Sequence, residues 1–330
     1  LLMSIAANRS APEILCFGEA MALYVAQTPG DLATVEHFQR RLAGADNNVA
    51  IGLSRLGFAV QWLSRVGTDS LGRYVRASLE AEGIDCRSLI EDAQHPTGLM
   101  FKEQAQDGRD PKVEYFRRGS AASHLSPDDA QGLDLSGLRH LHLTGITAAL
   151  SDSCLALCKT LIAKARDAGA TISFDPNLRP SLWPSETVMR ETLNALARQV
   201  DWVLPGLAEG QLLTGKDSAE EIADFYLDGG AKAVVIKLGP EGSFYRGVLD
   251  GQRHNLQVAG AAVAEVVDTV GAGDAFAVGV ISALLDGRPV QQALQRGNRL
   301  GARAVQVVGD MESLPDRRTL TTLEADDGAP

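Results

Sequence analysis

The sequence predicts an α/β fold in which a mostly parallel central sheet is covered by helices on both faces. Short runs rich in valine, isoleucine and leucine are each followed by apolar residues at helical spacing, which is the alternation typical of parallel sheets. The predicted strands are 14–19, 141–144, 171–175, 202–205 and 234–238. With 330 residues the chain can bury a large core, and we expect residues 1–330 to form a single domain.

Two segments fall outside this alternation and predict a second, smaller sheet. Residues 20–41 contain short β-like runs such as Leu23-Tyr24-Val25. Residues 97–118 contain two more, 98–102 and 113–117, which can pair as a hairpin across Asp107-Gly108. We expect the two segments to form a β lid over one edge of the core.

A glycine and a polar trio open the first predicted helix, which ends near Leu56-Gly57. The opening residues are Gly44, Ala45, Asp46, Asn47 and Asn48. Such residues at a helix start either cap the helix or present polar groups to a ligand. The residues alone leave both interpretations open.

The motif Asp268-Thr269-Val270-Gly271-Ala272-Gly273-Asp274 lies between a predicted strand at 262–267 and a predicted helix at 274–285. Small residues at such a turn allow close approach of a ligand, and the first amides of a helix attract an anion. Asp274 then suits a base that accepts a proton from a hydroxyl while those amides stabilise a transferred phosphoryl group. The alternative is an ordinary capped helix. A dinucleotide fingerprint fits poorly, because Phe276 stands where its third glycine is needed.

Composition narrows the classes of partner. The net charge of −11 argues against nucleic acid or an anionic membrane surface, and no apolar run approaches the roughly 20 residues that span a bilayer. The four cysteines lack a nearby metal-binding pattern, so we expect free thiols in a reducing compartment, the cytoplasm.

The 268–279 motif resembles the C-terminal signature of the ribokinase-like (PfkB) sugar kinases, and the 43–50 segment is similar to their N-terminal signature. The resemblance covers about residues 14–318 and implies a three-layer sandwich with a β lid. It implies that Asp274 is the catalytic base and that Gly271, Ala272 and Gly273 form the anion hole. It further implies that ATP and Mg²⁺ are used, and that residues 44–48 bind the sugar.

The run from Phe174 to Trp183 is closely similar to one in 2-keto-3-deoxygluconate kinases, a branch of that family. In this resemblance Asn177 and Arg179 contact the nucleotide phosphate or the sugar acid. On the lid, Tyr115, Phe116 and Arg117 hold the sugar acid, and Met100 stands where relatives have a tyrosine. The expected reaction converts 2-keto-3-deoxygluconate, at its primary hydroxyl, to 2-keto-3-deoxy-6-phosphogluconate.

Other functions stay open at this point. A fructokinase or ribokinase would act on a neutral sugar, and a non-catalytic protein of the same fold would only bind nucleotide or sugar. A nicotinamide-dependent oxidoreductase is disfavoured by the missing glycine. The lid could also form the surface of a homodimer or higher homo-oligomer, as it does in relatives.

The remaining site residues follow from the resemblance alone. It places the nucleotide loop at Lys237, Gly239, Gly242 and Ser243, with Asn298 near the adenine, and Asp310 on the sugar side. Gly206 replaces an asparagine of the family pattern, whereas Glu209 is retained and is expected to act on Mg²⁺ through water.

Two further patterns are interpreted as structural. Residues 210–217 nearly match a phosphate loop, but Asp217 replaces its hydroxyl residue and residues 211–213 predict the end of a helix. His140 and His142 share one strand face without a third ligand, so we expect no metal there.

Overall fold

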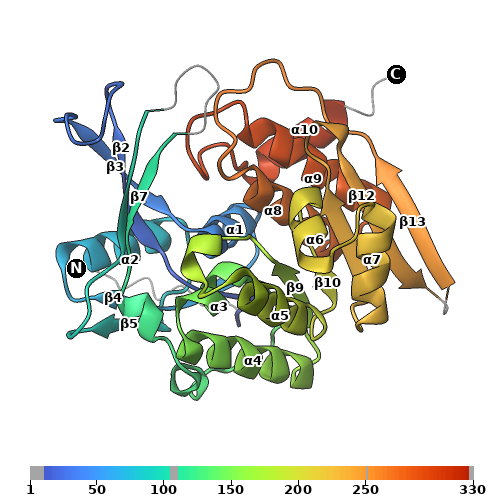
Figure 1. Cartoon of the computed structure of the whole chain (residues 1–330), viewed down its shortest axis with the longest axis horizontal. Helices are drawn as coiled ribbons and strands as arrows, with labels where there is room; N and C mark the ends of the chain where they lie inside the picture. Colours follow the sequence, from blue (N-terminus) through green and yellow to red (C-terminus); the bar gives the residue numbers. More distant parts are fainter. Residues whose placement is uncertain (1–10, 105–110, 250–251, 327–330) are drawn as a thin grey trace, which may run out of the picture.

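The computed structural model describes residues 11–104, 111–249 and 252–326. Its main element is a nine-stranded sheet in the order β13-β12-β11-β10-β9-β8-β1-β4-β5 (Figure 1). Strands β11 through β5 in this order run parallel, and β12 and β13 continue the sheet antiparallel. The strands are β1 Ile14–Phe17, β4 Val60–Gly67, β5 Leu89–Asp92, β8 His140–Thr144, β9 Thr171–Asp175, β10 Trp202–Val203, β11 Ala233–Lys237, β12 Ser243–Leu249 and β13 Gln252–Val258.

Helices cover both faces of this sheet, which confirms the predicted three-layer α/β architecture. Strand alternation sends Leu15 and Phe17 to one face and Ile14 and Cys16 to the other, and both sets are fully buried. One layer contains α3 Gly145–Leu150, α4 Asp152–Asp167, α5 Glu186–Ala197, α6 Leu207–Thr214 and α7 Ala219–Asp228. The other contains α1 Ala45–Arg55, α2 Ser70–Ala81, α8 Ala272–Leu285, α9 Val290–Ala304 and α10 Arg317–Asp326.

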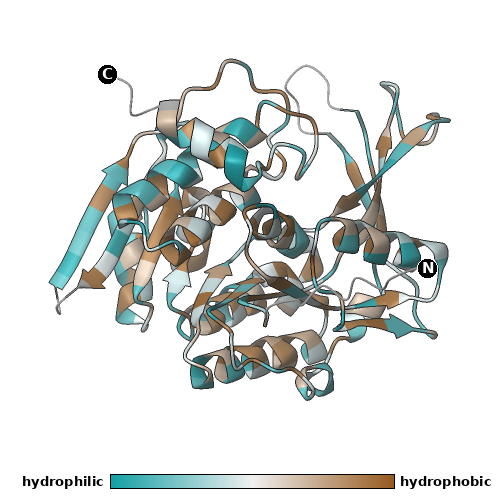
Figure 2. Ribbon diagram, turned by 180° about the vertical axis from the view of Figure 1, so that it is seen from behind, coloured by the Kyte–Doolittle hydropathy of each residue, from teal (hydrophilic) through white to brown (hydrophobic). Residues whose placement is uncertain are grey.

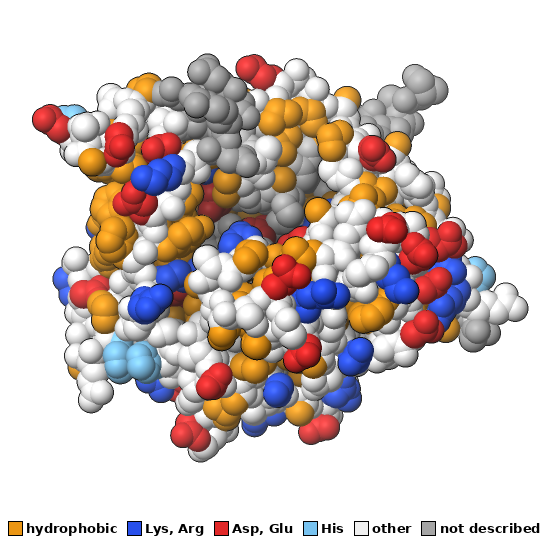
Figure 3. Space-filling view, in the orientation of Figure 1, with side chains coloured by type: hydrophobic (Ala, Val, Ile, Leu, Met, Phe, Trp, Pro, Cys, Tyr) orange, Lys and Arg blue, Asp and Glu red, His pale blue; other side chains and the backbone are white. Residues whose placement is uncertain are grey.

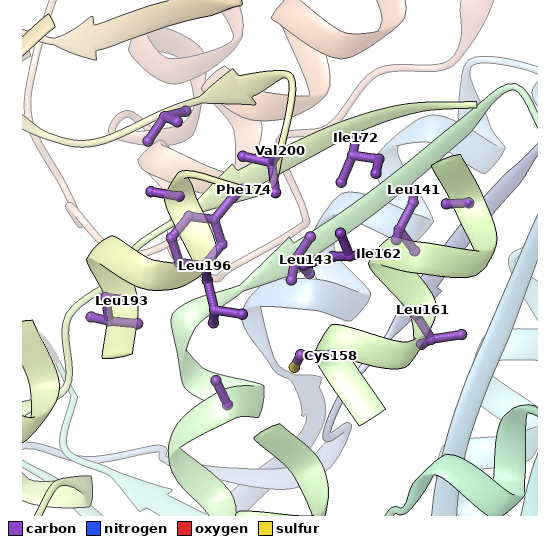
Figure 4. Close-up of a cluster of buried hydrophobic side chains, with 14 of the residues drawn as sticks. Leu141, Leu143, Cys158, Leu161, Ile162, Ile172, Phe174, Leu193, Leu196 and Val200 are labelled. Carbon is purple, nitrogen blue, oxygen red and sulfur yellow. The ribbon is translucent and has the colours of Figure 1, made fainter. Parts of the chain in front are cut away.

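The core under the first layer is shown in Figure 4. Leu141 and Leu143 of β8 project toward Leu161 and Ile162 of α4. Apolar residues line the buried sides of the helices, and hydrophilic residues gather on their outer sides (Figure 2). This pattern is expected of helices that each pack one face against a sheet and expose the opposite face to solvent.

The small sheet has the order β3-β2-β6-β7 and stands over one edge of the main sheet, as predicted (Figure 1). Its strands are β2 Met21–Ala26, β3 Phe38–Ala43, β6 Leu99–Lys102 and β7 Val113–Phe116. β6 and β7 pair antiparallel, which confirms the hairpin, while its predicted turn lies outside the described residues. Only Gly44 separates the lid strand β3 from helix α1, so the lid is joined directly to the core.

The predicted strand at 262–267 was wrong. The segment contains neither helix nor strand, and Val263 and Val266 are exposed. Its backbone is held at one end, where the N–H of Val267 donates to the carbonyl of Val305 at 2.7 Å. A β-branched run forms a strand only where a neighbouring strand pairs with it, and here the sheet ends at β13.

Helices α1, α8 and α9 pack closely because glycines face their neighbours. A Cβ on Gly52 of α1 would lie 2.5 Å from Cγ2 of Val278, and one on Gly279 would lie 2.6 Å from the Cα of Gly297. These contacts fix the position of α8, whose first turn carries the predicted catalytic residues.

Several smaller features bear on the remaining predictions. All four cysteines are buried free thiols. Helix α6 ends at Thr214 with Gly215 left-handed, so residues 210–217 do not form a phosphate loop. His140 and His142 are buried and bonded to Ser173, and the described residues hold no group of three ligands suited to a metal. Within the same ranges, every helix is too short or too polar to cross a membrane.

Candidate active site

A cavity of about 390 Å³ lies between the lid and the carboxyl ends of the central strands, and Figure 3 shows it as a hollow beside the lid. Parallel strands bring their carboxyl ends to one edge, so residues far apart in sequence meet there. The cavity collects most of the predicted residues, namely Gly44, Ala45, Asp46, Asn48, Met100, Tyr115, Arg117, Asn177, Arg179, Glu209, Lys237, Gly271, Gly273, Asp274 and Asp310.

The first turn of α8 forms the floor of this cavity. Gly271 is its N-cap and is left-handed, with φ of 78°. A Cβ there would lie 2.3 Å from the carbonyl oxygen of Asp310, so the position requires glycine. The amides that follow belong to the start of a helix and favour an anion. Gly273 and Asp274 line the cavity beside them, whereas Ala272 does not.

Asp274 is the buried carboxylate at this helix start. Its pKa is raised to about 8, mainly by burial and to a smaller extent by the charge of Asp175, while a hydrogen bond from Asn48 and the charge of Lys237 act in the opposite direction. Nδ2 of Asn48 lies 2.9 Å from Oδ2 of Asp274, and Nδ2 of Asn177 lies 3.5 Å from Oδ1. A carboxylate with a pKa near neutrality is suited to accept a proton from a hydroxyl.

Lys237 brings a positive charge to the same floor. Its Nζ lies 2.6 Å from Oδ2 of Asp175. A Cβ added to Gly273 would lie 3.5 Å from the same Nζ. Burial acts to lower the pKa of Lys237, but the charges of Asp175, Glu209 and Asp274 outweigh it and raise the pKa. The ammonium therefore stays charged beside the helix start, where it can attract a phosphoryl group.

Asp46 is the acidic residue of the other helix start, that of α1. Its carboxylate accepts hydrogen bonds from the backbone N–H and Oγ1 of Thr144 at 3.0 and 2.9 Å, and from Oγ1 of Thr147 at 3.1 Å. Burial raises its pKa to about 7, although these hydrogen bonds lower it. The prediction that Asn47 contacts the sugar is not supported, because Asn47 is fully buried and packs against Gly44 rather than lining the cavity.

The lid supplies the opposite wall. Met100 and Tyr115 line the cavity, but the prediction for Phe116 was wrong, because strand alternation turns it to the outer face, where it is 57% exposed. Arg117 is buried and ion-paired, with its Nη2 2.6 Å from Oε2 of Glu19. The other oxygen of Glu19 accepts a short hydrogen bond from Ser120. Much of the Arg117 charge is therefore compensated inside the protein.

Glu209 has both carboxylate oxygens bonded to backbone amides. Oε1 accepts from the N–H of Leu178 and Oε2 from the N–H of Gly206, each at 2.8 Å. Glu209 thus joins the start of α6 to the loop that carries Arg179. Arg179 is exposed and donates to the carbonyl of Leu178, and it makes no ion pair within the described ranges.

Some of the predicted nucleotide residues lie outside this cavity. Nδ2 of Asn298 donates to the carbonyls of Val258 and Ala259 at 3.2 and 3.0 Å. A Cβ on Gly242, which has φ of 99°, would lie 2.1 Å from that same Val258 carbonyl. Gly206, Gly239, Gly242, Ser243 and Asn298 do not line the cavity, and their nucleotide roles stay predictions.

Sequence reasoning missed four charged residues of the site, which are Glu19, Lys102, Asp175 and Asp268. Asp175 and Glu19 directly follow or end strands whose carboxyl ends were expected to meet, so their positions were a usable signal. Lys102 follows the cavity-facing period of its strand, two residues after Met100. Their pairing partners could not be inferred, because each lies more than 60 residues away in sequence.

A buried carboxylate beside a helix start and a lysine, under a lid, defines an enzyme that transfers a phosphoryl group to a hydroxylated small molecule. Residues 11–317 match the model of the pfkB family of carbohydrate kinases. The chain belongs to this family and is a carbohydrate kinase.

Three relatives illustrate the match. The 2-dehydro-3-deoxygluconokinase of Bacillus subtilis is 47% identical over 316 residues, with 94% of each chain covered. That of Thermoproteus tenax is 34% identical, with 92% of each covered. Fructokinase-1 of Zea mays is more distant at 30%, covering 92% of this chain and 94% of its own.

Solved structures confirm the ribokinase-like fold. A PfkB protein from Polaromonas sp. JS666 superposes with a TM-score of 0.85 at 49% identity, covering 94% of this chain and 99% of its own. An Escherichia coli candidate Ribokinase II in complex with ATP and Mg²⁺ superposes with a TM-score of 0.84 at 26% sequence identity. The match covers 96% of this chain and 99% of that chain. Vibrio cholerae fructokinase with fructose, ADP and calcium superposes with a TM-score of 0.81 at 28% sequence identity. The match covers 94% of this chain and 98% of that chain.

Proposed function

We propose that this protein is a 2-keto-3-deoxygluconate kinase that transfers the γ-phosphoryl group of ATP to the primary hydroxyl of the sugar acid. The product is 2-keto-3-deoxy-6-phosphogluconate. The observation that carries the proposal is the 47% identity, over nearly the whole chain, to a 2-dehydro-3-deoxygluconokinase, together with a cavity that contains the expected base. ATP is supported as the donor by the nucleotide-bound neighbours.

In this mechanism Asp274 accepts the proton of the attacking hydroxyl. Asn48 holds one of its oxygens, and Lys237 lies beside the small residue Gly273, which leaves room for a phosphoryl group. The amides at the start of α8 then stabilise the charge that develops on the transferred group. The lid excludes water, which would otherwise compete as the acceptor.

The described residues fit a magnesium ion that is carried by the nucleotide. They hold no group of three acidic or histidine ligands for a metal, and the oxygens of Glu209 are each bonded to an amide. Glu209 lines the cavity with both oxygens oriented by these amides, which supports a role on such an ion through water. When bound, Mg²⁺ would neutralise charge on the phosphates.

An acidic substrate is favoured by a second recess that adjoins the cavity. It has a volume of about 500 Å³ and shares Tyr115, Arg117 and Arg179 with the cavity. Its lining contains Arg118 as a third arginine and no aspartate or glutamate. In a chain of net charge −11, such a recess is suited to a carboxylate.

A neutral sugar is the second candidate, because Arg117 is already paired with Glu19 in the structure. The test is ADP release from ATP with magnesium, using 2-keto-3-deoxygluconate, fructose and ribose. We expect the largest kcat/KM with the keto-deoxy acid. A larger value with fructose or ribose would replace the proposed substrate with a neutral sugar, and no release with any of them would favour a binding protein.

Oligomerisation through the lid is part of the proposal. On the outer face, the ring of Phe101 lies 5.2–5.9 Å from those of Tyr24, Phe38 and Phe116. Hydrophobic side chains are visible over this part of the surface in Figure 3. Such a patch fits a homodimer contact. Light scattering measures the molar mass in solution, and Phe116→Glu should yield a monomer.

The four free thiols support a cytoplasmic location, and the acidic net charge argues against nucleic acid as a partner.

A further inference from the structure

Lys102 is a buried lysine that the proposed mechanism does not use. It belongs to lid strand β6, is 3% exposed and lines the cavity. Its Nζ lies 2.7 Å from Oδ2 of Asp268 and 4.0 Å from Oδ1 of Asp310. A charge removed from water to this extent is retained only where its partners compensate it.

Asp268 links this lysine to the backbone of the anion hole. Its Oδ1 accepts a hydrogen bond from the N–H of Val270 at 3.1 Å, one residue before Gly271. Its own N–H donates to the carbonyl of Val305 at 3.2 Å. The carboxylate therefore fixes the turn that leads into α8, and Lys102 holds that carboxylate from the lid side.

Asp310 lies on the other side of the same turn. Its carbonyl oxygen is in close contact with Gly271, while its side-chain Oδ1 is buried without a hydrogen-bond partner in the described part of the chain. The 4.0 Å separation from Lys102 is an ion pair rather than a hydrogen bond. Asp310 Oδ1 is thus able to accept a hydrogen bond from a hydroxyl group of a sugar in the cavity.

We propose that Lys102 is a positioning residue that couples the lid to the anion hole. The lid strand whose Met100 lines the cavity also holds Asp268 through Lys102, so the turn before Gly271 is fixed when β6 lies over the cavity. The inference rests on the proposed kinase function. It assigns Lys102 to the phosphoryl-transfer step rather than to ATP binding.

The test removes the link together with both charges of its 2.7 Å ion pair. Lys102→Met alone would leave Asp268 uncompensated and would destabilise the fold. The double variant Lys102→Met/Asp268→Asn replaces the ion pair by a neutral pair, and the asparagine oxygen can still accept from Val270. The matched control is Lys112→Met/Glu114→Gln, which removes an exposed lid ion pair of 2.9 Å.

We expect kcat for the sugar to fall at least tenfold in the double variant, with the KM for ATP within twofold of wild type. The control should keep wild-type values. A double variant whose kcat stays within twofold of wild type overturns the inference. So does a tenfold rise in the KM for ATP with kcat unchanged, since that would assign Lys102 to nucleotide binding.

A single substitution at Asp268 provides a second measurement. Asp268→Asn alone keeps the Lys102 ammonium and the acceptor for Val270, so a tenfold loss of kcat at unchanged melting temperature supports the coupling, and an unchanged kcat overturns it. Wild-type enzyme is assayed in parallel with the same sugars. If it phosphorylates none of them, the proposed function itself fails, and the inference falls with it; activity on a neutral sugar leaves the inference testable.

Discussion

Helices α1 and α8 begin in the same way and do different work. Each has a positive-φ glycine as its N-cap, Gly44 or Gly271, and each carries a buried aspartate in its first turn, Asp46 or Asp274. Burial raises the pKa of both acids, to about 7 and about 8. The two helix starts face one cavity.

The difference lies in the hydrogen bonds of the two carboxylates. Asp46 accepts three from the end of β8 and the start of α3, within 3.1 Å. Asp274 accepts one at 2.9 Å from Asn48 and a longer one from Asn177. A carboxylate that accepts several short hydrogen bonds is held in place by the fold, whereas one with more of its lone pairs available can take a substrate proton. The comparison therefore assigns structure to α1 and chemistry to α8.

The strongest test of this assignment is Asp274→Asn. We expect kcat to fall by roughly 1000-fold or more, because the amide cannot accept the hydroxyl proton. The folded state holds the Asp274 proton up to about pH 8, whereas the unfolded chain releases it near pH 4. This group therefore lowers the free energy of unfolding as pH rises between those values. Asp274→Asn should raise Tm more at pH 8.5 than at pH 5; equal shifts would contradict the assignment.

The matching change in α1 is Asp46→Ala. It leaves three buried donors on Thr144 and Thr147 without an acceptor, so we expect unfolding to become easier by about 2–4 kcal/mol. Urea denaturation monitored by tryptophan fluorescence measures this. If Asp46→Ala instead kept full stability and lost all turnover, the roles of the two acids would have to be exchanged.

Asn48 connects the two helices, so Asn48→Ala sharpens the comparison. Removing its hydrogen bond should raise the pKa of Asp274 further. The rise of kcat/KM with pH should move to higher pH by roughly one unit. Asn194→Ala is the control, since this buried asparagine donates to the carbonyl of Leu213 and does not line the cavity. An identical displacement in both variants would show that the effect is not specific to the Asp274 contact.

Gly52→Ala probes the contact that keeps the helices together. Its new methyl group would meet Val278 of α8 at 2.5 Å, so we expect a loss of about 1–3 kcal/mol of stability. Gly132→Ala, with no atom within 4 Å of the added Cβ, is the control. The Tm of each variant, measured by thermal unfolding, checks this. Equal Tm values for Gly52→Ala and Gly132→Ala would show that α1 and α8 can move apart without loss of stability.

Most of the sheet could be predicted from the sequence because its strands are buried on both faces. The run 14–17 is apolar throughout, and the structure forms β1 over those residues with all four buried. The antiparallel edge was not predicted strand by strand, since β12 and β13 are polar and exposed in part. The valine-rich segment 262–267 shows the reverse error, an apolar pattern without a strand to pair with.

The site was predictable where one residue type in one turn defines the chemistry, as at Gly271 and Asp274. It was not predictable where the function depends on a partner from another element. The pairing of Arg117 with Glu19 and that of Lys102 with Asp268 join residues about 100 and 170 positions apart, and no local signal identifies which residues pair. Such pairs form only when the fold has brought the elements together.

Strand β13 leaves one side of its backbone open at the rim of the main sheet (Figure 1), a surface on which chains can aggregate. Residues 252–255 of this strand, Gln-Arg-His-Asn, are exposed, and Arg253 is held by Asp224 and Asp228. A second sheet that approached this rim would have to desolvate those charges. The hydrophilic rim therefore protects concentrated protein against edge-to-edge fibre growth.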